Sequence, residues 1–398
     1  MDMRDDDVKN RLEQIANCIC EKIRQDQMLI HGGLYEGGFG VLLFLCYYSR
    51  YSNRKDIICL TEKYMNVLID QLDINTVSHT YCSGLSGILY LFEFLRENDF
   101  FDVSIDDEEE VLDQYLIKGI KENMQQGYFD FLHGVVGVGF YFIKRGKHEV
   151  LINDIINYLY DIAEKDDVNN VFKWKSILNM KKDIGYSIAL SHGMSSIALF
   201  LIRTIKNGYQ NDKINVMLEG IVNYILLQEM DGIQEGSYFP SYSLESDGGI
   251  PYRSRLGWCY GDLGVAFTLW EAGKILKKEW IVNKGFKVLL DSTKRTSMVE
   301  KSVVDSGICH GSIGLVMIYR RMYIETNNSA FLVAMEDWLK VALQFNMQGG
   351  VAGYKSYAGT EWLNDYSLLM GVSGIGLVFL SYITGGKQSW DELFLLSL

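Results

Sequence analysis

Two glycine-framed segments carry the residue types best suited to chemistry. They read "GWCYGDLG" at 257–264 and "GICHGSIG" at 307–314, and each places a cysteine, Cys259 or Cys309, two residues before a glycine, with His310 following the second. Two thiolates and an imidazole are good zinc ligands, and three protein ligands with a fourth position open are typical of a catalytic zinc site. The alternative is that both cysteines pack as small buried residues and His310 is a core histidine.

Both segments belong to an internal repeat that consists of a glycine, two residues, a second small residue and an apolar run. The repeat occurs seven times, and its leading glycines lie 47, 50, 59, 68, 50 and 60 residues apart. A period of this length, holding one supersecondary unit, indicates a repeat architecture. The leading glycines, called motif glycines below, are Gly37, Gly84, Gly134, Gly193, Gly261, Gly311 and Gly371.

The segments around the motif glycines predict pairs of helices. An amphipathic stretch precedes most motifs, as in 56–72, where Leu60, Tyr64 and Leu68 fall on one helical face. The run after each motif glycine is apolar nearly all round, so we expect it to form an inner helix and the amphipathic stretch an outer one. The other amphipathic stretches are 8–25, 108–124, 148–165, 213–228, 279–293 and 330–345. We predict an all-α fold, an α/α toroid of seven helix pairs and fourteen helices, with 1–398 as a single domain.

Two stretches depart from the helical pattern. Residues 232–256, before the fifth inner helix, hold both prolines of the chain, Pro240 and Pro251, with many turn residues and aromatics. They predict an irregular or β-rich insert, a hairpin or lid. Residues 166–186 concentrate four lysines; we interpret them as a solvated loop, with a binding surface as the alternative.

In a closed ring, equivalent positions of the repeats converge at one end of the axis, which would make Cys259 and Cys309 neighbours. His133 and His192 stand where His310 stands, immediately before a motif glycine. This register favours a general acid or base, for which we rank His192 ahead of His133. The alternative for each is a core histidine with a hydrogen-bond partner.

The composition excludes some classes of partner. The 398 residues include 38 basic and 51 acidic ones, a net charge of −13, which argues against nucleic acid. The first residues are charged throughout and the apolar runs are shorter than a membrane span, so we expect a cytoplasmic protein. The seven cysteines are scattered, and reduced thiols are expected.

Four segments together resemble a known family. "FDFLHG" (129–134), "LSHGMSS" (190–196), "RLGWCYG" (255–261) and "ICHGSIG" (308–314) occur in this order, and the chain resembles, over its whole length, the lanthionine synthetase C-like family of stand-alone lanthipeptide cyclases. The order and spacing of "WCYG" and "CHG" are more specific than either tetrapeptide alone. Ser195 and Ser196 depart from the small residues, commonly glycine, expected there.

The resemblance implies a zinc-dependent lanthipeptide cyclase. Such an enzyme adds peptide cysteine thiolates to dehydroalanine or dehydrobutyrine in a Michael-type step, which forms lanthionine and methyllanthionine thioether rings. It implies one zinc ion per chain on Cys259, Cys309 and His310. The residues that match the family's catalytic positions are His192, Asp130, Arg255 and Tyr260.

The roles of these residues follow from the reaction. Addition of sulfur to the β-carbon leaves an enolate, for which Arg255 is a candidate stabiliser, and His192 is our first choice to protonate the α-carbon. Asp130 would orient a base or an imidazole, or else is a solvated or helix-capping carboxylate. The candidates for promoting deprotonation of the substrate thiol are zinc alone, His192 and water.

The resemblance also implies partners. These are a dehydrated precursor peptide with a leader, a separate dehydratase and an ABC transporter complex, so that the cyclase would associate peripherally with a membrane-bound synthetase complex.

Four alternative functions stay open. They are an enzyme that adds glutathione, another zinc-thiolate alkylating enzyme on an α/α ring of the prenyltransferase type, a toroidal glycoside hydrolase, and a non-catalytic helical scaffold that binds peptides.

Overall fold

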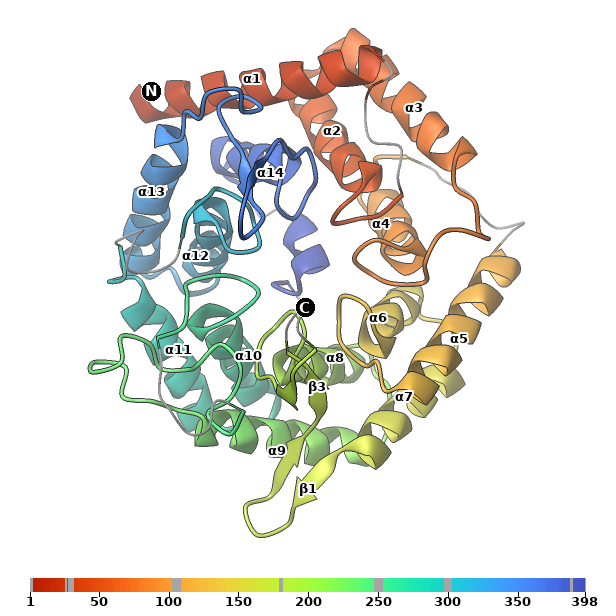
Figure 1. The fold of residues 1–398 in the computed structure, drawn as a ribbon, viewed down its shortest axis with the longest axis vertical. Coiled ribbons are helices and arrows are strands. Elements are labelled where there is room, and N and C mark those ends of the chain that lie inside the picture. The colour runs from red at the N-terminus through yellow and green to blue at the C-terminus, as the bar shows by residue number, and fades with distance from the viewer. Residues whose placement is uncertain are drawn as a thin grey trace. The chain divides into compact units, whose positions relative to one another are not determined.

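The computed structural model describes residues 3–25, 27, 32–101, 109–178, 182–246, 253–296, 303–386 and 389–397. The chain divides into two compact units. Unit 1 comprises Met1–Ile105 and Val303–Leu393, and unit 2 comprises Asp106–Ser302 and Phe394–Leu398. Helices account for most of the described residues of both (Figure 1).

The helices of unit 1 alternate between two kinds. Helices α2 (Gly38–Ser52), α4 (Leu85–Glu97), α12 (Ser312–Thr326) and α14 (Val372–Thr384) follow motif glycines and are buried along most of their length. Helices α1 (Met3–Arg24), α3 (Lys55–Asp70) and α13 (Ser329–Gln344) are amphipathic. In α3 the buried residues are Ile57, Thr61, Tyr64 and Leu68, a single stripe at helical spacing. A short hairpin of β5 (Ser356–Tyr357) and β6 (Trp362–Leu363) and a 3-10 helix at Trp390–Phe394 complete the described elements near the chain's end.

Unit 2 repeats this alternation. Its buried helices after motif glycines are α6 (Val135–Arg145), α8 (Met194–Lys206) and α10 (Asp262–Ile275). Its amphipathic helices are α5 (Glu109–Gln126), α7 (Glu149–Ile162), α9 (Lys213–Leu227) and α11 (Glu279–Ser292). Helix α8 packs against α9, and α10 packs against α11, as α2 packs against α3 in unit 1. Within the described residues the two units hold the fourteen α-helices that the repeat predicted, seven of each kind.

The strands of unit 2 lie in the stretch that we interpreted as a solvated loop, and that interpretation was wrong. Residues 164–186 form two antiparallel hairpins, β1 (Glu164–Asp166) with β2 (Val171–Lys173), and β3 (Lys175–Ile177) with β4 (Ile184–Tyr186). Trp174, between β2 and β3, is buried and donates its indole N–H to the Leu159 carbonyl at 2.9 Å. Strand β2 packs on α9 (Figure 1), so a tertiary contact stabilises the hairpin.

The described part of the 232–256 insert holds turns and bends but no strand, and 247–252 lie outside the described residues. The β-rich form that we predicted is therefore absent from 232–246 and 253–256, while the irregular form is present. The reason is a buried carboxylate at the start of α10. Asp262 accepts hydrogen bonds from the backbone N–H groups of Tyr238 and Phe239 at 3.0 and 2.8 Å and pairs with Arg295 at 2.8 Å. The Asp262 carboxylate thus accepts hydrogen bonds from two backbone N–H groups that, in a β-hairpin, would be available for pairing between strands.

Each of the seven motif glycines is the N-cap residue of the helix that follows, as the sequence predicted, and none caps it with a side chain. The reason for glycine is close approach of the backbone. A Cβ atom at Gly193 would lie 2.4 Å from the Ser187 carbonyl oxygen, and one at Gly311 would lie 2.3 Å from the Gly307 nitrogen. Gly261 differs because its φ is also positive, at +87°, a region that other residues rarely adopt.

No helix within the described ranges is long and apolar enough to cross a membrane.

Replacing Gly261 with alanine is expected to destabilise the protein by about 3 kcal/mol, because the new Cβ adds a clash to an unfavourable φ. It would lie 2.4 Å from the Arg255 carbonyl oxygen. Gly208→Ala is the matched control, since Gly208 has φ +82° and no atom lies within 4 Å of the position that a Cβ would occupy there. It is expected to cost about 1–2 kcal/mol, the φ penalty alone. Urea unfolding of both variants measures the difference, and equal losses would contradict the close-approach explanation.

Candidate active site and metal centre

In unit 2, the turns before α8 and α10 are joined by hydrogen bonds of the backbone. The N–H groups of Leu190 and Ser191 donate to the Cys259 carbonyl at 3.1 and 3.3 Å, and the Ser191 hydroxyl group donates to the same oxygen at 3.3 Å. His192 follows directly and Gly193 caps α8. The backbone of His192 is therefore held against the turn that carries Cys259.

Asp130 and His192 form a pair in unit 2. Asp130 lies in the turn before α6, and its Oδ1 accepts a hydrogen bond from the backbone N–H of His133 at 2.8 Å. Its Oδ2 lies 3.5 Å from Nδ1 of His192. Both side chains remain partly exposed, Asp130 at 21% and His192 at 30%, so the pair is accessible to a substrate.

The two side chains shift each other's pKa. Burial by itself would lower the pKa of His192, but the hydrogen bond and the charge of Asp130, with a further contribution from Cys259, outweigh it and raise this pKa above its usual value. Burial would raise the pKa of Asp130, but the hydrogen bond and charge of His192 and the His133 backbone N–H outweigh that effect and lower it. The geometry therefore favours a carboxylate beside a protonated imidazole.

Aromatic rings flank His192. The His133 ring stacks on it with centroids 5.7 Å apart and planes 25° from parallel, and the Tyr260 ring lies 6.3 Å away. Tyr242 packs edge-on against Tyr260, with centroids 5.7 Å apart. These contacts restrict the orientation of the imidazole and bring Tyr260, a residue named from the sequence, to its side.

Arg255 is not bonded to the Asp130–His192 pair within the described parts of unit 2. It lies in the same segment as Cys259 and is partly buried. No hydrogen bond or ion pair links its side chain to Asp130 or His192 in the described parts of unit 2. Its guanidinium donors are therefore not engaged by that pair.

Unit 1 carries Cys309 and His310 in the turn before α12. The N–H groups of Ile308 and Cys309 donate to the Leu369 carbonyl at 2.9 and 3.1 Å. These two hydrogen bonds join the turn before α12 to the turn before α14, as the bonds to the Cys259 carbonyl join two turns in unit 2. Cys309 is partly exposed, whereas Cys259 is buried.

Asp305 lies beside His310 and was not among the candidates named from the sequence. Its carboxylate is fully buried and accepts hydrogen bonds from the backbone N–H groups of Gly307 and Tyr357 at 3.1 and 3.0 Å. Its Oδ2 lies 3.8 Å from Nε2 of His310, and carboxylates commonly orient histidines that bind metals. A signal existed: Asp365 stands equally far before its own motif glycine and likewise binds a nearby backbone N–H.

The three predicted ligands, Cys259 in unit 2 and Cys309 and His310 in unit 1, are residue types that can hold a metal ion. The set contains two soft sulfur donors, one imidazole and no carboxylate, which suits zinc. Three protein donors leave one position of a tetrahedral ion for another ligand. The donor chemistry therefore fits the metal that the sequence predicted.

A cavity of about 590 Å³ in unit 2 opens beside the Asp130–His192 pair. It is lined by residues before α6, by the hairpin of β3 and β4 and by His192. The hairpin residues in the lining are Lys175, Ser176, Ile177 and Ile184. These residues were not predicted as part of a site because their segment was interpreted as a solvated loop.

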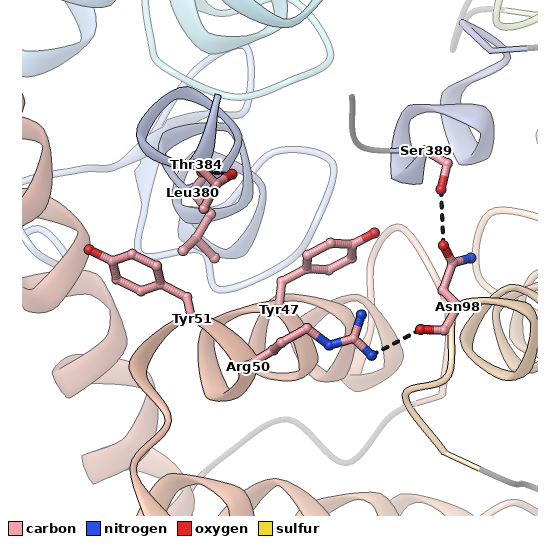
Figure 2. A pocket seen from close by; sticks show the side chains of 7 residues that line it. All are labelled: Tyr47, Arg50, Tyr51, Asn98, Leu380, Thr384 and Ser389. Atoms are coloured by element: carbon pink, nitrogen blue, oxygen red, sulfur yellow. Dashed lines mark hydrogen bonds between the residues drawn. The ribbon is translucent and has the colours of Figure 1, made fainter. Parts of the chain in front are cut away.

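A second cavity, of about 410 Å³, lies in unit 1 (Figure 2). Its lining includes Tyr47, Arg50 and Tyr51 from the last turns of α2, with Leu380 and Thr384 from α14. Arg50 donates to the Asn98 carbonyl at 2.9 Å. Because these residues lie toward the C-terminal ends of the helices, the cavity is separate from the turns that carry the site.

The comparison with protein families decides the family. The model of the lanthionine synthetase C-like proteins matches residues 30–395. The chain belongs to this family. A curated relative, the nisin biosynthesis protein NisC of Lactococcus lactis subsp. lactis, is 22% identical over 407 aligned positions, gaps included, which cover 96% of this chain and 93% of that protein.

A solved structure of a nisin cyclase matches this lanthionine synthetase C-like protein with a TM-score of 0.76. The two chains are 20% identical, and the match covers 98% of this chain and 97% of the other. The predicted fold class, an α/α toroid of helix pairs, is thereby confirmed, as is the resemblance seen in the sequence.

Replacing Asp130 with asparagine is expected to lower the pKa of His192, because the charge that opposes the effect of burial is removed. Nuclear magnetic resonance titration of the histidine ring protons in chelator-treated protein measures it. Asp167→Asn, an exposed acid in the turn of the first hairpin, is the control with the same change in net charge. An unchanged His192 titration in Asp130→Asn would contradict the pairing.

The same pair makes stability depend on pH. The raised pKa of His192 contributes stability that is fully present below 6.5, the usual pKa, and is lost as the pH rises through the folded value. The lowered pKa of Asp130 contributes stability above 3.8 that is lost as the pH falls through its folded value. The stability difference between wild type and Asp130→Asn is therefore expected to peak between these values.

Proposed function

We propose that this chain is a zinc-dependent lanthipeptide cyclase, which adds peptide cysteine thiolates to dehydroalanine or dehydrobutyrine and so forms lanthionine and methyllanthionine. The observation that carries the proposal is the Asp130–His192 pair. It lies next to Cys259, because the residues just before His192 donate backbone hydrogen bonds to the Cys259 carbonyl. An acid–base pair beside a candidate metal-binding thiol suits an addition that needs a thiolate and then a proton. Membership of the lanthionine synthetase C-like family supports it.

In this proposal Cys259, Cys309 and His310 hold one zinc ion per chain. Asp305 acts through His310, whose ring it orients. When bound there, zinc would lower the pKa of a substrate thiol and so favour the thiolate at neutral pH.

His192 supplies the proton that completes the addition. The new C–S bond forms at the β-carbon of the dehydrated residue, and the electrons of its C=C bond move through the α-carbon onto the amide oxygen. His192, protonated because of its raised pKa, then donates a proton to the α-carbon. The substrate thiol releases one proton, so the net change is addition of S–H across the double bond.

Asp130, Arg255 and Tyr260 assist this step in the proposal. Asp130 fixes Nδ1 of His192 and stabilises the imidazolium, which leaves Nε2 to face the substrate. Arg255 carries donors that suit the negative oxygen of the enolate. Tyr260 packs beside His192 and limits the motion of the imidazole.

The partners follow from the reaction. The substrate is a dehydrated precursor peptide with a leader, which a separate dehydratase must supply, and an ABC transporter complex would export the product. We place the enzyme in the cytoplasm, at the periphery of a membrane-bound synthetase complex.

The substitution His192→Asn tests the function. It is expected to slow thioether formation on a dehydrated peptide by about 10²–10⁴-fold, because the general acid is lost, while zinc content stays at the wild-type level. The measurement is mass spectrometry of the peptide after alkylation of its remaining thiols. His148→Asn is the control, because His148 pairs with Asp113 near the start of α7, outside the cavity lining.

Two outcomes would count against the proposal. A wild-type rate in His192→Asn would refute the role of His192 as the acid. If the wild-type protein joined glutathione to the dehydrated residues but closed no ring in the peptide, the function would be that of a glutathione-adding enzyme.

A further inference from the structure

The 590 Å³ cavity of unit 2 is lined by both polar and apolar side chains. Asp130, His133 and His192 are among the polar ones. The hairpin of β3 and β4 and the chain before α6 add exposed apolar side chains to the lining. These are Tyr128 at 46% exposure, Ile177 at 45% and Ile184 at 71%. We call these three residues the apolar wall.

The isoleucines of the apolar wall lie opposite each other. Ile177 and Ile184 are cross-strand partners in the antiparallel pairing of β3 with β4, so their side chains point to the same face of the hairpin. Much of their apolar surface remains in contact with water, where it adds nothing to the stability of unit 2. An exposed apolar patch that adjoins a polar site is typical of a ligand-binding surface.

The charges of the cavity are already matched. Apart from histidines, its described lining has two charged side chains, Lys175 and Asp130. Nζ of Lys175 lies 2.9 Å from Glu164, and Asp130 pairs with His192. Because each charge has an opposite charge beside it, the lining is better suited to an uncharged group than to an acidic or basic side chain.

We propose that this cavity is a subsite for an apolar side chain adjacent to the dehydrated residue of the substrate peptide. This inference rests on the proposed cyclase function. The apolar wall receives the side chain and determines specificity. The peptide is thereby positioned with its dehydrated residue next to His192.

Equilibrium binding tests this subsite without any turnover. The probes are two fluorescein-labelled ten-residue peptides with alanine in place of dehydroalanine, which differ only in having leucine or serine on both sides of that alanine. Wild-type protein is expected to bind the leucine peptide about tenfold more tightly, the discrimination typical of a small apolar pocket. In the double variant Ile177→Ser, Ile184→Ser this preference is expected to disappear, while the affinity for the serine peptide stays within about twofold.

Val168→Ser is the matched control, because Val168 is 93% exposed at the turn of the neighbouring hairpin and does not line the cavity. It is expected to keep the tenfold preference. Thermal unfolding checks that the double variant is folded. If it is not, Ile184→Ser alone, which changes the most exposed residue of the wall, is expected to reduce the preference at least threefold.

Equal binding of the two peptides by wild type, or an undiminished preference in a folded variant, would overturn the subsite. This result would leave the cyclase proposal intact if thioether rings still form. A preference that depends on the apolar wall, in a protein that closes no ring, would instead support the subsite and contradict the cyclase.

Discussion

The structure depends on the close approach of the backbone at the motif glycines. At Gly193 and Gly311 a Cβ atom would lie within 2.5 Å of backbone atoms of the preceding turn, so a side chain at these positions would force the turn open. Each of these turns leads directly into a helix that is buried along most of its length. It also fixes the one or two residues before the glycine at the start of the helix, where Cys259, Cys309, His192 and His310 are found.

The turns position side chains because they are also bonded to one another. In unit 1 the chain of backbone hydrogen bonds runs from Cys309 to Leu369, from Leu369 to Tyr35 and from Tyr35 to Cys82. In unit 2 the corresponding bonds join Leu190 and Ser191 to Cys259. Each turn is thus held by its own close packing and by a neighbour, and such preorganisation is what an acid–base pair or a metal ligand needs.

The sequence was most informative where a local rule repeats. Seven motif glycines predicted seven buried helices, and the position just before a glycine made His192 a candidate, whose imidazole lies beside Asp130 in the structure. Contacts between distant residues were not predictable from local patterns. The hairpins at 164–186 depend on packing against α9, and the lack of a strand around Tyr238 depends on Asp262, 24 residues downstream of it. The apolar wall and the position of Asp305 beside His310 depend on tertiary neighbours in the same way.

The proposed zinc site of Cys259, Cys309 and His310 is tested most directly by the zinc content of purified protein. Elemental analysis of the wild type is predicted to give about one zinc ion per chain, with loss of zinc in both Cys259→Ala and Cys309→Ala. Cys82→Ala is the matched control, because Cys82 is also a buried cysteine two residues before a motif glycine and lies outside the donor set. It is predicted to keep its zinc. Wild-type protein without zinc, or zinc that survives both substitutions, would contradict the account.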